Sequence, residues 1–299
     1  MQSRNGALGI FLILLLFASG AILSARLLFG DRVPGLTHDR VAVLPITGII
    51  ESERQFVKDL DSFREDPSVK AFVVEIRSPG GGVGASQAIH GELERLRRED
   101  ERPVIAWIGD VGASGGYYVA LPADSIFALP GSITGSIGVI MQFPNAEELF
   151  RKVGVELEVV KSGRLKDIGS PVRELTEQER MVLQELVDDV WNQFVEAVMQ
   201  GRDLDRPRVE DLADGRIFSG ERALDMGLID RLGTLQDALD TAGEMAGLGP
   251  HPRTIRPTRQ RIGLLDLLLG GIEESRLASW IGPVSAGTAS TPRLRYEWP

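Results

Sequence analysis

Short apolar segments alternate with amphipathic helical segments over residues 41–160, and this alternation constrains the fold more than any other feature. Residues 69–76 (VKAFVVEI) form an apolar run that is typical of a strand in a sheet covered on both faces. A glycine-rich turn follows this run, and then a helix is expected near 86–98. Strands that alternate with helices in this way indicate an α/β fold with right-handed crossovers.

The same patterning predicts further elements on both sides of this unit. Strands are expected at 41–46, 102–109 and 155–163, and helices at 51–64 and near 146–153. A short helix is expected directly after the strand that ends near residue 109.

The second half of the chain is predicted to be helical. Residues 176–202 form a long amphipathic pattern that begins with Thr176 and has Glu179 three residues later, which is the signature of a capping box. Residues 213–247 are expected to continue as a helical stretch. Beyond them, spaced arginines precede an apolar helix, which could bind an anionic membrane surface or cover the body or a neighbouring subunit.

The N-terminal residues 7–25 are apolar and carry no charged side chain. A helix of this length is about long enough to cross a bilayer. A cleaved secretory signal and a retained anchor are the two interpretations. The run is longer than a typical signal core, and residues 23–25 are a poor cleavage site, so a retained anchor is favoured.

Composition excludes some classes of protein. The net charge of −10 argues against a nucleic-acid-binding protein, which would carry a basic surface. The chain has no cysteine, so it has no disulfide, no thiolate nucleophile and no thiolate metal site.

One serine stands in a pattern typical of a nucleophile at a tight turn. Gly112, Ser114 and Gly116 spell G-x-S-x-G between a predicted strand and a predicted helix. The N–H group of Gly115 could stabilise a developing oxyanion, and a second donor could come from the glycines of residues 78–82 (SPGGG).

A serine nucleophile needs a base, and none of the histidines is well placed by sequence. The chain has three: His38 lies beside the N-terminal apolar run, His90 lies on a predicted helix, and His251 stands between two prolines. An α/β-hydrolase has its histidine after the nucleophile, so that interpretation would require His251.

A lysine is the better candidate, because a desolvated lysine can become neutral whereas an arginine cannot. Lys166 lies in a loop after the predicted strand that ends near residue 160. In an apolar cleft its ammonium would lose hydration, and the neutral amine could accept the proton of Ser114. Lys161 is the local competitor, and a solvated loop lysine without a catalytic role is the structural alternative.

Several motifs occur in an order that resembles the signal peptide peptidase A family of serine-lysine proteases. They are RSPGGG, GASGGYYVA, GSITGSIGV, SGRLKDIGSP and ADGRIFSGERALDMGLIDRLG, within residues 41–247. The resemblance implies an α/β fold like that of Clp protease and the crotonases. Such a fold has repeated β-β-α units and a helical C-terminal part, and here it would be preceded by one transmembrane helix.

The resemblance also implies roles for individual residues. Ser114 would be the nucleophile, Lys166 the general base, and Gly81 and Gly115 the oxyanion donors, while Ser136 would orient the lysine amine. No metal or organic cofactor would be needed. Half-length chains of this kind form homo-oligomeric rings, so the lysine could reach the serine of a neighbouring subunit.

We therefore expect an anchor and juxtamembrane segment at 1–38, a peptidase domain at 39–247 and a C-terminal extension at 248–299. The expected protein is a single-pass serine endopeptidase of the cell membrane, with an extracytoplasmic catalytic domain. Its partners would be the lipid bilayer and its peptide substrates, which are remnant signal peptides and other apolar membrane-derived peptides.

Other functions fit parts of the sequence. A related serine-lysine hydrolase could cut stomatin-type membrane proteins, and a non-enzymatic membrane scaffold would keep Ser114 and Lys166 only as structural residues. A crotonase-type acyl-CoA enzyme is less favoured, because it would leave the membrane segment and the serine-lysine pair unexplained. Fold alone decides none of these.

Overall fold

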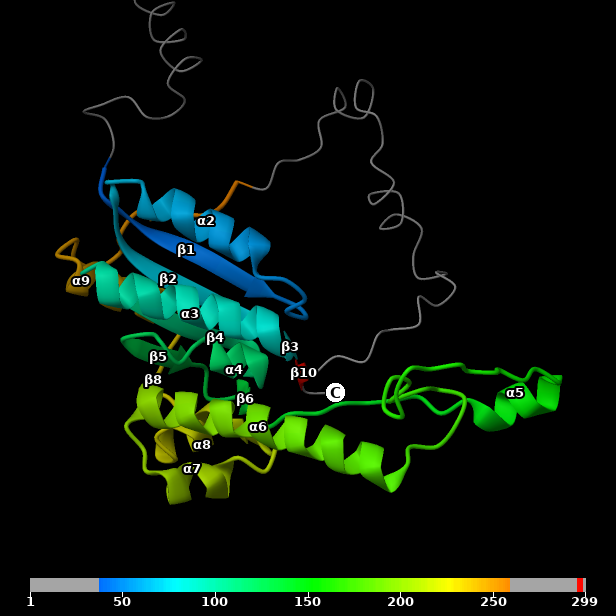
Figure 1. The fold of residues 1–299 in the computed structure, drawn as a ribbon. Coiled ribbons are helices and arrows are strands. Elements are labelled where there is room, and N and C mark those ends of the chain that lie inside the picture. The colour runs from blue at the N-terminus through cyan, green and yellow to red at the C-terminus, as the bar shows by residue number, and fades with distance from the viewer. Residues whose placement is uncertain (1–37, 259–294, 298–299) are drawn as a thin grey trace, which may run out of the picture. The chain divides into compact units, whose positions relative to one another are not determined.

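A computed structural model of the chain describes residues 38–258 and 295–297 (Figure 1). From Arg40 onward the chain forms a compact unit built on an eight-stranded sheet. Its main path has the order β7-β6-β4-β2-β1-β9; β5 pairs with both β4 and β8, and β3 and β10 form a separate two-stranded sheet.

The strands are β1 (Arg40–Thr47), β2 (Val69–Ser78), β3 (Gly80–Gly82), β4 (Val104–Ala113), β5 (Ser125–Ala128), β6 (Ile133–Gly135), β7 (Ile217–Ser219), β8 (Arg231–Leu232), β9 (Thr254–Ile255) and β10 (Arg295–Glu297). The helices are α2 (Arg54–Arg64), α3 (Val83–Glu99), α4 (Gly115–Tyr118), α5 (Glu147–Val153), α6 (Glu177–Arg202), α7 (Arg206–Leu212), α8 (Gly220–Asp225) and α9 (Leu235–Met245).

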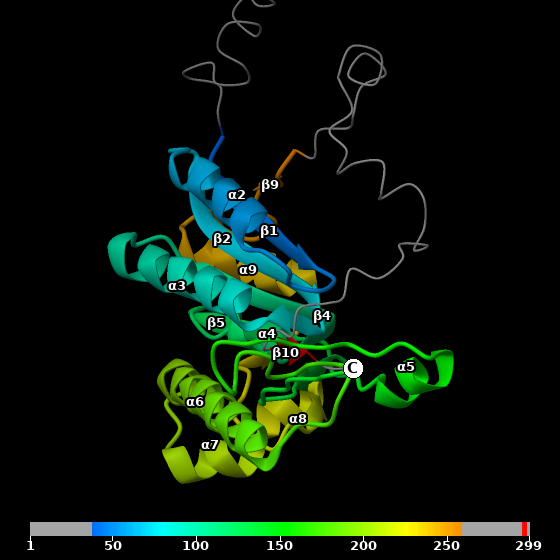
Figure 2. The ribbon, with the colours of Figure 1, turned by 45° about the vertical axis from the view of Figure 1, so that its right-hand side comes forward.

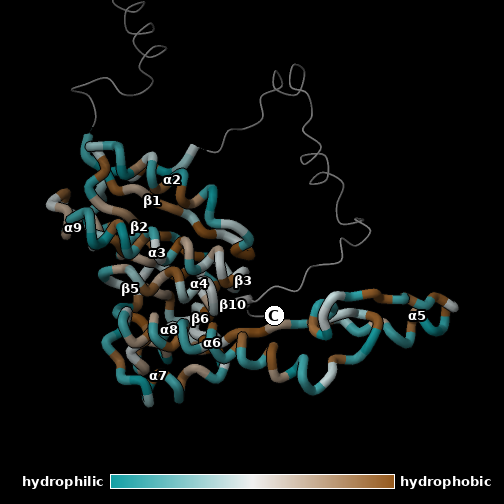
Figure 3. Tube along the Cα trace, viewed as in Figure 1, coloured by the Kyte–Doolittle hydropathy of each residue, from teal (hydrophilic) through white to brown (hydrophobic). Residues whose placement is uncertain are grey.

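The centre of the sheet is parallel and buried on both faces. β1, β2, β4 and β5 pair in parallel, whereas β7 joins β6 in the antiparallel direction. Alternate residues of β2 enter two different apolar clusters: Phe72 and Val74 pack toward the side of α2 and α3, while Ala71 and Val73 pack toward α9. Figures 1 and 2 show these helices on opposite faces, and Figure 3 shows the strands as apolar. The prediction of an α/β sheet covered on both faces is therefore confirmed.

The long helix α6 begins where the sequence predicts. The side chain of Thr176 accepts a hydrogen bond from the N–H of Glu179, and the N–H of Thr176 donates to the Glu179 carboxylate at 2.8 Å. The predicted capping box is thus present. Further along, Phe194 of α6 packs edge-on against Tyr118 of α4, with 5.0 Å between the ring centres.

Two predicted elements are wrong. Residues 155–163 do not form a strand, because no neighbouring strand of the described chain pairs with them; their side chains are exposed, and Val160 is 96% exposed. Residues 213–247 are not continuously helical. β7 and β8 interrupt them, and Gly215 and Gly227 adopt the positive φ angles of 89° and 77° that break a helix.

The predicted N-terminal anchor (residues 7–25) and the apolar helix of the C-terminal extension lie outside the described residues. Among the helices of residues 38–258, none combines the length and the apolar character that crossing a bilayer requires.

Candidate active site

Ser114 leaves the sheet at the end of β4, between two neighbouring strands. Gly112 lies opposite Ser78 of β2, and Ala113 lies opposite Gly135 of β6. The N–H of Ser114 donates to the carbonyl of Gly135 at 2.8 Å. The serine is therefore held at the carboxyl edge of a parallel sheet, which is a common position for ligand sites in open α/β folds.

The backbone at Ser114 is strained, and its two flanking glycines are required by close contacts. Ser114 has φ 52° and ψ −117°, a conformation that residues with a side chain rarely adopt. A Cβ atom on Gly116 would lie 2.6 Å from the Ser78 carbonyl oxygen, and one on Gly112 would lie 2.7 Å from the Ile108 side chain. The G-x-S-x-G spacing therefore has a steric cause in this fold.

The helix after the serine is fixed by its two tyrosines. The Tyr117 hydroxyl donates to the carbonyl of Leu228 at 2.7 Å, and burial raises the pKa of Tyr117 well above its usual value. The Tyr118 ring packs against the His90 ring in a tilted arrangement, with 4.7 Å between ring centres. Burial lowers the pKa of His90, so this histidine is a neutral packing residue at pH 7.

The N–H of Gly81 points to the edge of β3 that faces away from Ile50. Gly82 donates to the carbonyl of Ile50 at 2.8 Å, and Ile50 donates to the carbonyl of Gly80 at 2.8 Å. Because successive peptide groups of a strand point to opposite edges, the N–H of Gly81 points away from Ile50. At that opposite edge lies β10, with Tyr296 opposite Gly81.

Gly115 and Ser136 lie beside Ser114. Gly115 begins α4, where first-turn N–H groups have no acceptor within the helix. Ser136 directly follows Gly135, whose carbonyl holds Ser114, and it is buried with a positive φ of 50°. The structure therefore brings Ser114, Gly115 and Ser136 together at the end of β4, and Gly81 follows closely after the neighbouring β2.

Lys166 is not part of this group within the subunit. It is exposed and lies in the segment between α5 and α6, which projects from the sheet (Figures 1 and 2). Within residues 38–258, its ammonium group makes no hydrogen bond or ion pair with Ser114 or with any other residue. Lys161 differs, since its ammonium group pairs with the Asp167 carboxylate and donates to the Arg164 carbonyl at 3.1 Å.

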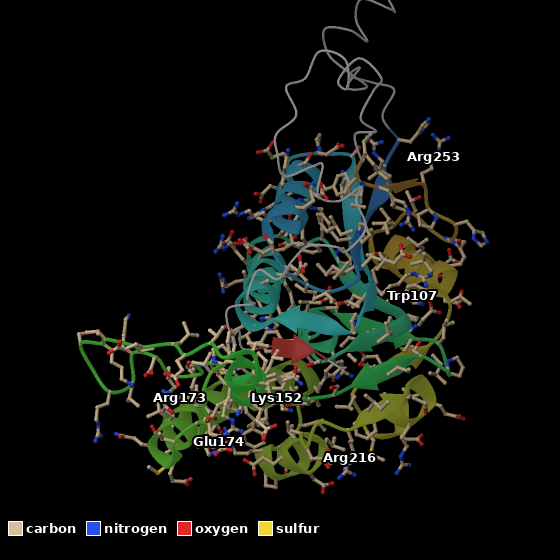
Figure 4. All side chains as sticks on the ribbon, turned by 90° about the vertical axis from the view of Figure 1, so that its right-hand side faces the viewer. Trp107, Lys152, Arg173, Glu174, Arg216 and Arg253 are labelled. Carbon is tan, nitrogen blue, oxygen red and sulfur yellow. The ribbon has the colours of Figure 1, made fainter. Side chains whose placement is uncertain are left out.

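An ionic network that the sequence does not reveal holds the segment around Lys166. Arg173, labelled in Figure 4, donates to Glu179 at 2.8 Å and lies 3.0 Å from Asp167. These hydrogen bonds from Arg173, joined by those from Lys161 and from the N–H of Thr176, lower the pKa values of Asp167 and Glu179 to about 2. The network connects the Lys166 segment to the first turn of α6. In the sequence, only the capping-box spacing of Thr176 and Glu179 indicated part of this network.

The remaining histidine candidate lies elsewhere. The His251 side chain is 77% exposed, its Nδ1 atom is 3.4 Å from the Asp240 carboxylate, and within the described chain no hydrogen bond connects it to Ser114. Across residues 38–258, no group of three or more His, Asp or Glu side chains is placed to hold a metal ion.

A groove adjoins the strand that carries Gly81. It lies between the end of β1 and α2. Apolar side chains of Ile46, Ile49, Ile50 and Phe56 share its wall with the charged side chains of Glu51, Lys58 and Asp59. Because Ile50 bridges to Gly81, the groove borders β3 on the edge opposite β10.

Known proteins resemble this chain in sequence. Residues 96–249 match the peptidase family S49. A Synechocystis protein described as "Putative protease slr0021" is 43% identical over 237 residues, covering 79% of this chain and 84% of its own length. An Enterococcus faecium protein described as "Putative signal peptide peptidase SppA" is 36% identical over 220 residues, covering 69% and 64%.

One solved structure, described as a mutant of the 1510-N membrane-bound stomatin-specific protease, matches with a TM-score of 0.48 at 18% identity. The match covers 75% of this chain and 100% of that one. The family match spans the serine turn and the segment that carries Lys166. The chain belongs to peptidase family S49 and is a serine protease.

Proposed function

We propose that the chain is a membrane-anchored endopeptidase that uses Ser114 as nucleophile and Lys166 as general base. The observation that carries this proposal is the strained turn at Ser114, held between β2 and β6 with the Gly115 N–H beside it. Strain of this kind is found at catalytic nucleophiles and persists only where the surrounding structure maintains it. The sheet would then follow the fold of Clp protease and the crotonases.

In the proposed reaction, the Ser114 Oγ attacks the scissile carbonyl while the Lys166 amine takes its proton. The N–H groups of Gly81 and Gly115 stabilise the oxyanion, and Ser136 orients the amine. The lysine then gives the proton to the leaving amine. A water molecule, activated by the same lysine, hydrolyses the acyl-enzyme and restores the serine.

The lysine would come from a neighbouring copy of the chain. Lys166 is exposed and unpaired within the described subunit, whereas Ser114 is 1% exposed. The same projecting segment exposes apolar side chains, with Leu157 59%, Val159 50% and Val160 96% exposed. Exposed apolar groups gathered on one segment are typical of an interaction surface, which supports a homo-oligomeric ring.

The substrates would be remnant signal peptides and other apolar membrane-derived peptides. An anchor at residues 7–25 would keep the enzyme close to such peptides, which supports this class. We place the protein in the cell membrane with one span and an extracytoplasmic catalytic domain.

The test uses the full chain in detergent with a fluorogenic apolar peptide. Ser114→Ala and Lys166→Ala should each abolish hydrolysis, while His251→Ala and Lys152→Ala should retain it. Lys152 is a matched control because it is an exposed lysine on α5, in the same projecting segment (Figure 4). Activity that survives Lys166→Ala but is lost in His251→Ala would contradict the serine-lysine pair. A folded wild type inactive on every peptide would favour a scaffold.

The origin of the lysine is tested by co-expressing the two inactive chains. If the pair forms between subunits, mixed assemblies of Ser114→Ala and Lys166→Ala chains combine an intact serine with an intact lysine, and should regain about one quarter of the wild-type rate. A pair formed within each subunit would give no recovery.

A further inference from the structure

Strand β4 contains a bulge just before the serine turn. Up to Ile108 the strands β2 and β4 pair residue by residue, but Ser78 of β2 then lies opposite Gly112. Between these two pairs β4 has three residues, 109–111, where β2 has one. Bulges of this kind occur next to active sites, where they redirect a side chain. This bulge ends two residues before Ser114, so its shape affects the direction in which the serine leaves the sheet.

Two buried hydroxyl groups hold the bulge, one from Ser132 just before β6 and one from Thr134 within β6. The Ser132 Oγ donates to the carbonyl of Gly109 and accepts from the N–H of Leu129 at 2.9 Å. The Thr134 Oγ1 donates to the carbonyl of Gly112 at 2.8 Å. Both side chains are buried, so neither carbonyl can turn to solvent for another donor. The two hydroxyl groups therefore fix the two ends of the bulge.

The bulge and the strained serine turn are held by the same strand. The carbonyl of Gly112 accepts its hydrogen bond from Thr134. Two residues later, the N–H of Ser114 donates to the carbonyl of Gly135 at 2.8 Å. A strained conformation such as φ 52° at Ser114 persists only where surrounding contacts impose it. Loss of one of these contacts should therefore let the turn relax.

We propose that Ser132 and Thr134 are positioning residues for the nucleophile. Their hydroxyl groups hold the β4 bulge in the shape that directs the Ser114 Oγ toward the substrate carbonyl, and they act through the backbone of β4 without touching substrate. Within the motif GSITGSIGV, the proposed reaction uses only Ser136, so this inference gives a role to the other two hydroxyl groups near it. The inference rests on the proposed function, since it presupposes that Ser114 is the nucleophile.

A displaced nucleophile should slow the chemical step and leave substrate binding nearly unchanged. Gly81, which is proposed to contact the substrate, lies on β3, and neither hydroxyl group bonds to that strand. A reacting group misplaced by about 1 Å costs about a hundredfold in rate. Loss of one hydroxyl group, which relaxes the bulge only in part, should lower kcat about tenfold and change KM less than about twofold.

The first experiment measures the serine turn without catalysis. The full chain is compared with Thr134→Val, which removes the hydroxyl group but nearly keeps the side-chain shape. Amide exchange reports local opening, so residue-resolved measurement should show the Ser114 amide exchanging about tenfold faster in Thr134→Val. The Gly82 amide, bonded to the Ile50 carbonyl, is the internal reference and should not change. Thr134→Ser keeps a hydroxyl group and should restore slow exchange at Ser114.

Ser125→Ala is the matched control. The hydroxyl group of Ser125 is buried on β5, which also pairs with β4, but it makes no hydrogen bond with any described residue. Its removal should change neither Ser114 exchange nor kcat. Ser132→Ala is a second variant, which keeps the test decisive if Thr134→Val does not fold. Wild-type exchange of the Ser114 amide in both Thr134→Val and Ser132→Ala would overturn the inference.

The second experiment measures KM and kcat on an extended apolar peptide. Thr134→Val and Ser132→Ala should each lower kcat about tenfold with KM within about twofold, and Thr134→Ser should recover most of the loss. A raised KM at unchanged kcat would contradict a positioning role. If no chain, wild type included, hydrolyses any peptide but Ser114 exchange still depends on Thr134, then the proposed function fails while the control of the Ser114 turn by Thr134 stands.

Discussion

The serine and the lysine of the proposed catalytic pair lie in two differently built regions. Ser114 is 1% exposed and is held by strand pairing on two sides, by a short helix and by close contacts that admit only glycine. Lys166 is exposed on a projecting segment that is held mainly by charged side chains around Arg173. The serine region depends on packing, whereas the lysine region depends on ion pairs.

This difference suggests how the site would be assembled. A strained turn needs a rigid frame, and the parallel sheet supplies one within a single subunit. A base delivered by another subunit needs a segment that extends from its own sheet but keeps a fixed local shape. Ion pairs can provide that shape where there is no core to pack against. Substitutions that disturb packing should therefore affect mainly the serine region, and substitutions that remove charge should affect mainly the lysine region.

The largest effect is expected from Gly116→Ala, in the serine region. The added Cβ atom would lie 2.6 Å from the Ser78 carbonyl oxygen, so α4 or the end of β2 must move. Overpacking of this kind should lower the free energy of unfolding by about 2–3 kcal/mol. Displacement of Ser114 should also reduce kcat/KM about a hundredfold. Chemical denaturation and peptide hydrolysis measure the two effects.

Gly91→Ala is the matched control for this change. Gly91 lies within α3, and a Cβ atom there would contact nothing within 4 Å. Alanine at this exposed helical position should raise stability by about 0.5–1 kcal/mol and leave activity unchanged. Equal destabilisation by both substitutions would show that the serine turn is not specially close-packed.

The next effect is expected from Arg173→Leu, in the lysine region. This change leaves the buried Glu179 carboxylate without its main partner and releases Asp167 from one of its two cations. We expect kcat/KM to fall about a hundredfold through misplacement of Lys166, with little change in global unfolding. Arg173→Lys should restore part of the activity. Arg180→Ala, at an exposed arginine of α6, should have no effect.

Acid should loosen the segment around Lys166, with a smaller effect than Arg173→Leu. The pKa values of Asp167 and Glu179 are lowered to about 2 in the folded chain, below their unfolded values near 4. A lowered pKa contributes stability that is present above the unfolded pKa and is lost as pH falls through the folded one. Between about pH 4 and pH 2, pepsin should cut residues 161–179 increasingly fast. Unchanged cutting over this interval would contradict the role of the network.

The sequence predicts the serine region well because its signals are local. The apolar runs, the G-x-S-x-G spacing and the capping box of α6 each depend on neighbouring residues, and each matches the structure around Ser114 and Thr176. The family resemblance implied for Ser136 only the role of orienting the lysine amine, and the structure adds that Ser136 lies beside Ser114. The physical cause of this position, the bond from Ser114 to Gly135, joins two strands and leaves no local pattern.

The failures concern residues whose partners are distant in the sequence or are not found in the described chain. Residues 155–163 have a strand-like pattern, but the described chain offers no edge for them to pair with. The pairing of β10 with β3 joins residues far apart in sequence, and a segment as short as 295–297 has no periodicity to reveal it. Local patterns therefore predicted elements, while the contacts that assemble the site needed the structure.

The smallest effect is expected from Lys161→Met, which distinguishes two lysines of one loop. Lys161 pairs with Asp167, but Arg173 also lies 3.0 Å from that carboxylate and would keep it compensated. Loss of one such partly exposed ion pair should leave stability nearly unchanged and change kcat/KM by less than about threefold. Lys166→Met, which breaks no ion pair in the described subunit, should instead abolish hydrolysis while leaving the loop intact. If both substitutions abolished activity equally, the experiment would not favour Lys166 over Lys161 as the general base. If only Lys161→Met did so, the ion pair with Asp167 would have to open in the assembled enzyme to release Lys161 for catalysis.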